Sequence, residues 1–186
     1  MGLGLFSFAI KFYRRSTTPK NVCFSSPVQF NSHMKFRGEG AFFLGARTRN
    51  RGTVILESVL KTSKITIGKN VFLNSNCMIV CRKEITIGDD CMFGPNVFVY
   101  DHDHYFTKTK VFPYKYREKE IQIGKNVWIG ANVVILRGSV IGDGSVIGAG
   151  SVVNGVVPAR SIVRPAPTII EPIAEKTLKN DDYRSL

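Results

Sequence analysis

The chain has 186 residues and a mass of 20.7 kDa, with 44% hydrophobic and 22% charged residues, which suits one compact domain rather than two. Ordinary apolar content and the absence of low-complexity tracts argue against intrinsic disorder. The formal net charge is +12 and the sequence pI is near 9.8, so we expect an anionic partner of some kind.

Most of the excess charge lies in the first 64 residues. They contain eleven lysines and arginines against two glutamates, a net +9, whereas the other 122 residues contribute only +3. Residues 1–27 are predicted to form a basic, partly amphipathic segment that contacts an anionic membrane surface, with packing on its own domain as the alternative. The apolar run LGLFSFAI is followed by KFYRR, which is the reverse of a signal peptide, and no run approaches the length of a membrane span.

A six-residue period organises the middle of the chain. From Ile123, five consecutive hexads begin with an aliphatic residue: IGKNVW, IGANVV, ILRGSV, IGDGSV and IGAGSV. The pattern also occurs over 67–78 and 87–104, and between these blocks 79–86 has eight residues where six would keep the phase. Neither a helix of 3.6 residues per turn nor a two-residue alternation has this period, so it predicts a triangular solenoid in which each side is a short strand and a corner.

Each hexad position has an expected role in this all-β, parallel β-helix fold. The first aliphatic residue points into the prism, the small fifth residue fills a corner, and Gly and Asn supply turn geometry. The β-helix domain is expected over 28–168, with irregular coils over 28–64, where the phase is not clean. Prolines at 158, 165 and 167 end the regular structure, and 169–186 is predicted to be a short C-terminal helix and tail.

The cysteines do not indicate a disulfide framework or a structural zinc site. They form no CxxC pair and have no histidine at zinc-finger spacing, so reduced thiols in a cytosolic protein are expected. Cys77 and Cys91 take the fifth position of their hexads and are predicted to be small core residues. Cys81 falls in the out-of-phase segment, and its role is left open.

Histidine is scarce, and two of the three histidines lie in one string, YDHDHYF at 100–106. The string closes the first hexad block, and a polar, basic loop over 105–120 projects before the repeat resumes. One imidazole there can act as a general base while a carboxylate or a backbone carbonyl fixes its tautomer. The alternative is a solvated pair of histidine and aspartate side chains.

The runs IGDDCMFGPNVFVYDHDHYF and IGKNVWIGANVVILRGSVIGDGSVIGAGSVV resemble the hexapeptide-repeat acyltransferases. The resemblance covers 65–170 and is strongest to galactoside and maltose O-acetyltransferases and to the O-acetyltransferases of bacterial surface polysaccharides. It implies a left-handed β-helix, a homotrimer with active sites between subunits, acetyl-CoA as co-substrate and a saccharide acceptor.

The resemblance also implies roles for individual residues. His104, nine residues after Pro95, corresponds to the catalytic base, with His102 as the fallback. Asn74 and Asp103 are expected to contact the acceptor. The residues expected to bind the coenzyme are Trp128, Ala131, whose backbone N–H is also the expected oxyanion donor, Ala149, Asn154 and Arg164.

One departure from the family concerns the coenzyme phosphates. The family places a Lys or Arg after a proline that corresponds to Pro167, but Thr168 stands there in this chain. Arg164 or Arg160 is the expected substitute. A basic cluster at Lys108, Lys110, Lys115, Arg117 and Lys119 is placed either to meet the coenzyme phosphates or the acceptor, or simply to be solvated.

The sequence therefore predicts an acetyl-CoA-dependent O-acetyltransferase that acts on a sugar hydroxyl, of a bacterial surface polysaccharide or its precursor, by direct transfer to the acceptor. The alternatives are an amino-sugar N-acetyltransferase and a non-catalytic β-helix scaffold or binding protein. A zinc carbonic anhydrase of the same fold needs three histidine ligands, and His33 lies far upstream, so no metal is expected. No nucleic-acid partner is expected, and the protein is predicted to be cytoplasmic, in peripheral contact with the inner face of the membrane.

Overall fold

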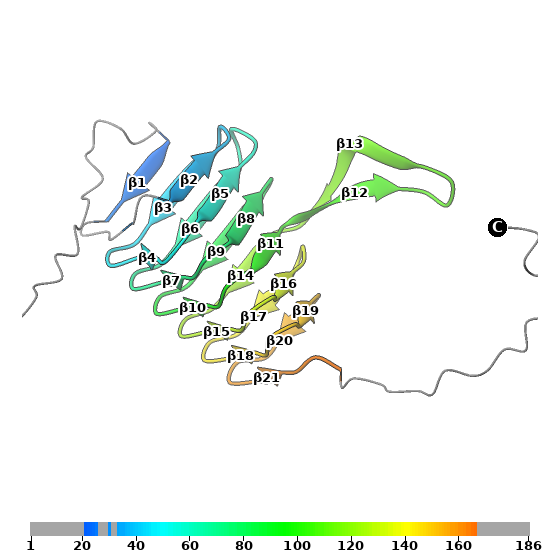
Figure 1. Ribbon diagram of the computed structural model, residues 1–186. Helices are drawn as coiled ribbons and strands as arrows, with labels where there is room; N and C mark the ends of the chain where they lie inside the picture. The colour runs from blue at the N-terminus through cyan, green and yellow to red at the C-terminus, as the bar shows by residue number, and fades with distance from the viewer. Residues whose placement is uncertain (1–20, 26–29, 31–32, 167–186) are drawn as a thin grey trace, which may run out of the picture.

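The computed structural model describes residues 21–25, 30 and 33–166, and this part of the chain is a parallel β-solenoid with one projecting hairpin (Figure 1). After the first strand, successive solenoid strands pass from one face to the next, so every third one, not counting the two hairpin strands, returns to the same sheet. Residues 1–20 of the predicted membrane segment and the predicted C-terminal helix and tail at 169–186 lie outside the described residues.

Three parallel sheets form the faces of the described solenoid. The first face has seven strands: β1 (Val22–Phe24), β3 (Ala41–Leu44), β6 (Lys64–Ile67), β9 (Glu84–Ile87), β14 (Ile121–Ile123), β17 (Val140–Ile141) and β20 (Val156–Val157). The second face has six: β4 (Arg49–Asn50), β7 (Phe72–Leu73), β10 (Met92–Phe93), β15 (Trp128–Ile129), β18 (Val146–Ile147) and β21 (Ile162–Val163). The third face has six: β2 (Met34–Arg37), β5 (Val54–Ser58), β8 (Cys77–Cys81), β11 (Phe98–Tyr100), β16 (Val134–Ile135) and β19 (Val152–Val153).

The strand register confirms three hexads per coil after the hairpin. Ile123 pairs with Ile141 and Trp128 with Val146, each with the residue eighteen positions later, whereas in the last coil Ile141 pairs with Val157, sixteen positions later. Earlier coils are longer, because Leu44 pairs with Ile67, twenty-three positions on. These extra turn residues conceal the phase over 28–64, where the chain nevertheless forms regular rungs. Strand β1 pairs with β3, so the solenoid begins before residue 28.

The interior follows the hexad positions. The first-position residues of the later hexads are at most 2% exposed: Ile123, Ile129, Ile135, Ile141 and Ile147. Burial of each such side chain contributes about 1.5–3 kcal/mol relative to exposure. Cys77 and Cys91 are buried as predicted, and the undetermined Cys81 is buried too. At the corners, Ser139 and Ser145 donate hydrogen bonds to the carbonyls of Leu136 and Pro158 at 2.7 and 2.9 Å, so their burial leaves no hydroxyl unpaired.

The second and fourth positions of the hexad have different roles. The fourth-position residues Asn96 and Asn126 have φ of 57° and 54°, the left-handed region expected for a turn. The turn interpretation is confirmed for the fourth-position glycines Gly144 and Gly150, whose φ is 67° and 76°, and it is wrong for the second-position glycines, whose φ is not positive. A Cβ on Gly88 would lie 2.6 Å from the carbonyl carbon of Gly124, so this position is small because adjacent coils approach each other closely.

The predicted projecting loop is an ordered antiparallel hairpin. Strands β12 (His102–Phe106) and β13 (Val111–Glu118) pair with each other and extend away from the solenoid (Figure 1). The hairpin therefore begins at His102, three residues before the predicted start at 105. The hairpin projects from the solenoid between β11 on the third face and β14 on the first face. It therefore lies at the corner opposite the second face.

Candidate active site

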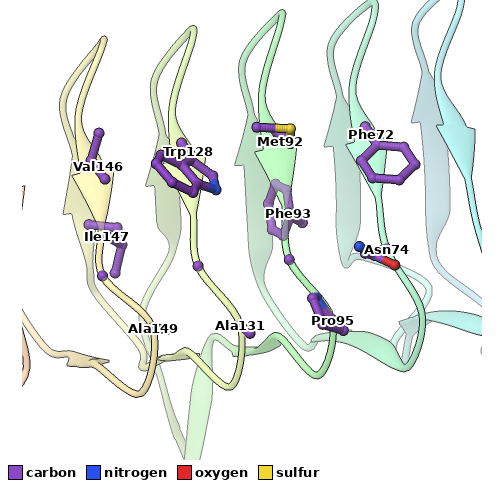
Figure 2. Close-up of a pocket in the computed structure, with 13 residues that line it drawn as sticks. Phe72, Asn74, Met92, Phe93, Pro95, Trp128, Ala131, Val146, Ile147 and Ala149 are labelled. Atoms are coloured by element: carbon purple, nitrogen blue, oxygen red, sulfur yellow. The ribbon is translucent and has the colours of Figure 1, made fainter.

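A groove of about 400 Å³ runs along the second face, across four consecutive coils (Figure 2). Apolar side chains of the first residue of each strand line one part of it: Phe72, Met92, Trp128 and Val146. Residues at the following turn line the other part: Asn74, Pro95, Ala131 and Ala149. The groove thus brings together four residues predicted as site residues, although up to 75 positions separate them in sequence.

The apolar wall consists of residues that point outward from the sheet. Met92 pairs with Phe72 on one side and with Trp128 on the other, and Trp128 pairs with Val146. Met92 is 46% exposed and Trp128 52%, so the wall is open to solvent. The sequence identified Trp128 but not the other three. Their signal was present, since an outward-facing position that stays apolar over four coils indicates a binding surface.

The turn side of the groove presents polar groups beside small residues. Asn74 stands at a second hexad position, which is glycine in the next three coils along the groove, and its Oδ1 accepts a hydrogen bond from the Ser75 N–H at 2.8 Å. A Cβ on Gly94 would lie 2.7 Å from the Ala131 nitrogen. Within the described chain, no acceptor is paired with the Ala131 N–H. This N–H is therefore available at the groove wall, as an oxyanion donor must be.

A second cluster lies at the root of the hairpin, around a buried carboxylate. Asp101 is fully buried and accepts hydrogen bonds from the backbone N–H groups of Arg82 and Lys83 at 2.8 and 2.7 Å and from the Cys81 thiol at 3.3 Å. His102 Nδ1 lies 3.1 Å from Asp101 Oδ1. Burial disfavours the charged carboxylate, but the hydrogen bonds from His102, Arg82, Lys83 and Cys81 outweigh burial and lower the pKa of Asp101. Burial, with the nearby Asp101 charge, raises the pKa of the Cys81 thiol.

The two histidines contact the same tyrosine but differ in their surroundings. The centroid of the Tyr116 ring lies 5.6 Å from that of His102 and 4.8 Å from that of His104, and the Arg82 guanidinium sits 3.7 Å from it. The His102 side chain is only 15% exposed and its ring is held by Asp101. His104 is exposed, and among the described residues its ring nitrogens have no hydrogen-bond partner. His104 is thus free to meet a ligand, whereas His102 is anchored.

Asp103 is engaged within its own chain. Its Oδ2 forms an ion pair with Nε of Arg137, which the sequence did not identify. Asp103 therefore already has a partner within its own chain, and its expected contact with the acceptor stays a prediction. The partner could not be foreseen, because Arg137 occupies an ordinary hexad position on a different coil.

The remaining coenzyme candidates lie outside the groove. Asn154 follows β19 on the third face and is exposed. Arg164 follows β21 on the second face, also exposed, and a Cβ on Gly148 at the groove wall would lie 3.7 Å from its Cα. Arg164 therefore borders the groove, whereas Asn154 does not.

The site residues of one chain form two separate halves. Asn74, Trp128, Ala131 and Ala149 share the groove on the second face, and the histidines lie at the opposite corner. Over the described residues, no group of three or more His, Cys, Asp or Glu side chains could hold a metal ion, and no helix is long and apolar enough to cross a membrane.

Two family models match the solenoid on either side of the hairpin. The model "Bacterial transferase hexapeptide (six repeats)" matches residues 120–155, and the model "Hexapeptide repeat of succinyl-transferase" matches residues 64–100. Both segments of the solenoid therefore match hexapeptide-repeat models of transferases. The chain is also 40% identical over 64 residues to nodulation protein L of Rhizobium meliloti (strain 1021), an alignment that covers 34% of this chain and 35% of that relative.

Solved structures of acyltransferases and acetyltransferases are similar to this chain. The polySia-specific acetyltransferase NeuO is 26% identical with a TM-score of 0.66, over 84% of this chain and 71% of its own. A hexapeptide-repeat acetyltransferase from Vibrio cholerae O1 biovar eltor, complexed with acetyl coenzyme A, is 38% identical with a TM-score of 0.50 over 55% of both chains. AntD, an N-acyltransferase from Bacillus cereus, has a TM-score of 0.65 over 76% of both chains and, at 21% identity, shows the fold alone. The fold is the left-handed parallel β-helix that the repeats and their resemblance predicted.

Proposed function

We propose that this protein is an acetyl-CoA-dependent O-acetyltransferase that modifies a sugar hydroxyl, of a bacterial surface polysaccharide or its precursor. The observation that carries the proposal is the convergence of Asn74, Trp128, Ala131 and Ala149 on one groove. Coils of different length separate these residues in the sequence. They come together only because the coils stack in the observed strand register. The acetyl coenzyme A complex of the Vibrio cholerae relative and the acetyltransferase activity named for NeuO support the same class of reaction.

The groove fits a thioester co-substrate. Its wall is apolar and open at Met92 and Trp128, which suits an extended pantetheine arm, and the small side chains of Ala131 and Ala149 leave the turn uncrowded. Arg164 at its border is the proposed contact for the coenzyme phosphates. Acetyl-CoA supplies the activated acetyl group. An unpaired Ala131 N–H directed at the developing oxyanion would contribute about 3 kcal/mol to stabilisation of the transition state.

The proposed base is His104. It accepts the proton of the sugar hydroxyl while the oxygen of that hydroxyl attacks the thioester carbonyl. The carbon–sulfur bond then breaks and the leaving thiolate takes the proton from His104, so that an acetyl ester, the free thiol and the neutral imidazole result. Its exposure and its unengaged ring nitrogens favour it over His102, whose contact with Asp101 anchors the hairpin root. No side-chain nucleophile is needed. Asn74 is the proposed contact for the acceptor.

The separation of the two halves supports a homotrimer with active sites between subunits. His104 and the groove lie on opposite sides of one prism, so a single chain cannot bring a base to a thioester held in its own groove. A neighbouring copy whose hairpin reaches the groove would complete the site. Light scattering with size-exclusion chromatography tests this: a mass three times 20.7 kDa is expected, and an active monomer would contradict it.

The reaction is tested by acceptor-dependent release of thiol from acetyl-CoA. The full chain is incubated with neutral oligosaccharides, acidic polysaccharides and amino sugars, and the products are analysed by mass spectrometry and NMR. We expect an acetyl ester on a sugar oxygen. An amide product would replace this proposal by N-acetylation, and no acceptor-dependent release with any sugar would favour a non-catalytic binding protein.

The cellular location is proposed from charge alone. Residues 1–64 carry a net +9, which favours a cytoplasmic enzyme held at the inner, anionic face of a membrane. Sedimentation with anionic vesicles is expected to decrease when the first 20 residues are removed. Unchanged sedimentation would contradict a membrane role for that segment.

A further inference from the structure

Several lysines of the solenoid pair with carboxylates, whereas the cations between Asp103 and Glu118 on the hairpin do not. On the solenoid, Lys64 pairs with Glu84 at 2.9 Å and Lys83 with Glu120 at 2.7 Å. The sequence between Asp103 and Glu118 contains four cations and no carboxylate: Lys108, Lys110, Lys115 and Arg117. None of these four lies within ion-pair distance of a carboxylate among the described residues, and the carboxylates at the two ends of this stretch are taken by Arg137 and Arg82. The hairpin therefore carries uncompensated positive charge.

Aromatic rings hold three of these cations in place. The Lys115 ammonium lies 4.7 Å and the Arg117 guanidinium 4.8 Å from the centroid of the Tyr105 ring, and the Lys110 ammonium lies 5.1 Å from that of Phe112. Cation–π contacts restrain such a cation without neutralising it or using its N–H donors. The hairpin thus presents preorganised cationic donors to solvent.

A bulge places this surface directly beyond the proposed base. His104 pairs with Tyr116, but the next residue, Tyr105, pairs with Phe112, so 113–115 form extra residues on β13. Pro113 suits such a position because it has no N–H to donate to the ladder. Tyr114 at the centre of the bulge is 93% exposed. Bulges next to active sites commonly redirect a side chain, and here an exposed ring and a cation follow the base on the same arm.

We propose that the hairpin is a binding arm for an anionic saccharide, which it guides to His104. The acid groups of such a saccharide would meet Lys110, Lys115 and Arg117, and its sugar rings would contact Tyr114. An anionic glycan is favoured over a lipid surface because the cations begin beside the proposed base and because the tip, TKTK at 107–110, is polar. The inference rests on the proposed transfer to a saccharide, and it adds the charge of that saccharide and the place where it binds.

Binding without acetyl-CoA tests the arm independently of turnover. The full chain is titrated with an oligogalacturonate, a carboxylated saccharide, and with a malto-oligosaccharide of equal length by isothermal calorimetry at low and high salt. We expect tighter binding of the oligogalacturonate, weakened by salt. In the double variant K115Q/R117Q, the Kd of the oligogalacturonate should rise about five- to tenfold, because two exposed charges that attract the ligand are removed.

Two further variants test whether the loss of affinity comes from the hairpin itself or only from the lower net charge of the protein. K61Q/K69Q removes the same charge from the solenoid, where both lysines lie near carboxylates, and should change the Kd less than about twofold. Tyr114→Ala, at a solvent-exposed position, should weaken both saccharides without lowering the melting temperature. An equal loss in both double variants would overturn the proposal.

Other outcomes also overturn it. If K115Q/R117Q loses binding to phosphatidylglycerol-containing vesicles but not to oligogalacturonate, the hairpin is a membrane contact. If K115Q/R117Q instead loses affinity for coenzyme A, the hairpin cations bind the co-substrate. Failure of the proposed function is seen separately, as no acceptor-dependent thiol release in a protein that still binds the saccharide through the hairpin.

Discussion

The solenoid and the hairpin position their side chains by different means. In the solenoid, the hexad position of a residue decides whether it is buried, turns the chain or faces solvent, so Ile129 and Ile147 have equivalent surroundings one coil apart. In the hairpin, each important contact is specific to a pair, as between Asp101 and His102 or between Lys115 and Tyr105. The rigid repeat supplies the groove, and the irregular insertion supplies the titratable and charged groups. The following predictions test this division.

The largest effect is expected at the hairpin root. His104→Ala should lower kcat by about 10²- to 10⁴-fold, the usual contribution of a general base, with little change in affinity for acetyl-CoA. Thiol release and coenzyme calorimetry measure the two quantities. His102→Ala is the matched comparison, and it should mainly lower the melting temperature because it removes the partner of Asp101. The reverse result, with activity lost only in His102→Ala, would transfer the role of base to His102.

Adjacent residues of one strand should differ strongly in the solenoid. Phe93 is fully buried and Met92 is 46% exposed. Phe93→Ala should lower the free energy of unfolding by about 3–5 kcal/mol because it leaves a cavity. Met92→Ala should lower it by less than about 1 kcal/mol and should weaken coenzyme binding instead. Urea unfolding measures the loss in the free energy of unfolding for both variants. Similar losses for the two variants would contradict the alternation of inward and outward positions.

The same substitution at two glycines tests the two roles of glycine in the hexad. Gly88→Asn should lower the free energy of unfolding by about 3 kcal/mol, since even a Cβ would lie 2.6 Å from the backbone of the next coil. Gly150 has φ of +76°, a backbone region that asparagine tolerates, and a Cβ there would meet no atom within 4 Å beyond its chain neighbours. Gly150→Asn should therefore be nearly neutral. Thermal melts measure the destabilisation of both variants. Equal destabilisation would contradict the two separate roles of glycine.

A smaller, pH-dependent effect is expected at Asp101. Its lowered pKa means that the folded state favours the carboxylate, so the stabilisation is fully present above the unfolded pKa of about 3.9 and is lost as pH falls through the lower folded value. Asp101→Asn should cost about 1.5–3 kcal/mol at neutral pH. The difference between variant and parent should shrink on acidification below pH 4. Urea unfolding across this range measures it, and a difference independent of pH would show that the charge is not involved.

Much of the solenoid could be predicted because its physics is periodic. The five later hexads specified burial for each first-position isoleucine, the earlier hexad at 87–92 did so for Cys91, and the eight residues at 79–86 showed where the six-residue phase is broken. The rungs over 28–64 were less clear, since coils of twenty-three residues do not repeat a six-residue phase. Second-position glycine was misinterpreted because a single coil does not show how closely the next one approaches.

The candidate site could be predicted only in part. Trp128, Ala131, Ala149 and Asn74 were identified by resemblance and do share a groove. The ion pair of Asp103 with Arg137 was not foreseeable, since it joins the hairpin to a different coil. The sequence did not reveal that the histidines and the groove lie on opposite sides of the prism, because this depends on where in the coil the insertion leaves.

By itself, the sequence determined the period, the inward-facing residues and the presence of an insertion that carries the histidines. These features follow from local rules. A six-residue repeat fixes how the coils stack, and a segment without the repeat must project from the solenoid. Only the tertiary structure decided which residues meet across coils: the groove of Met92 and Trp128, the buried Asp101 that holds His102, and the cations resting on the rings of the hairpin. Such contacts join residues that no local pattern relates, since they depend on register between coils and on the direction in which the hairpin projects.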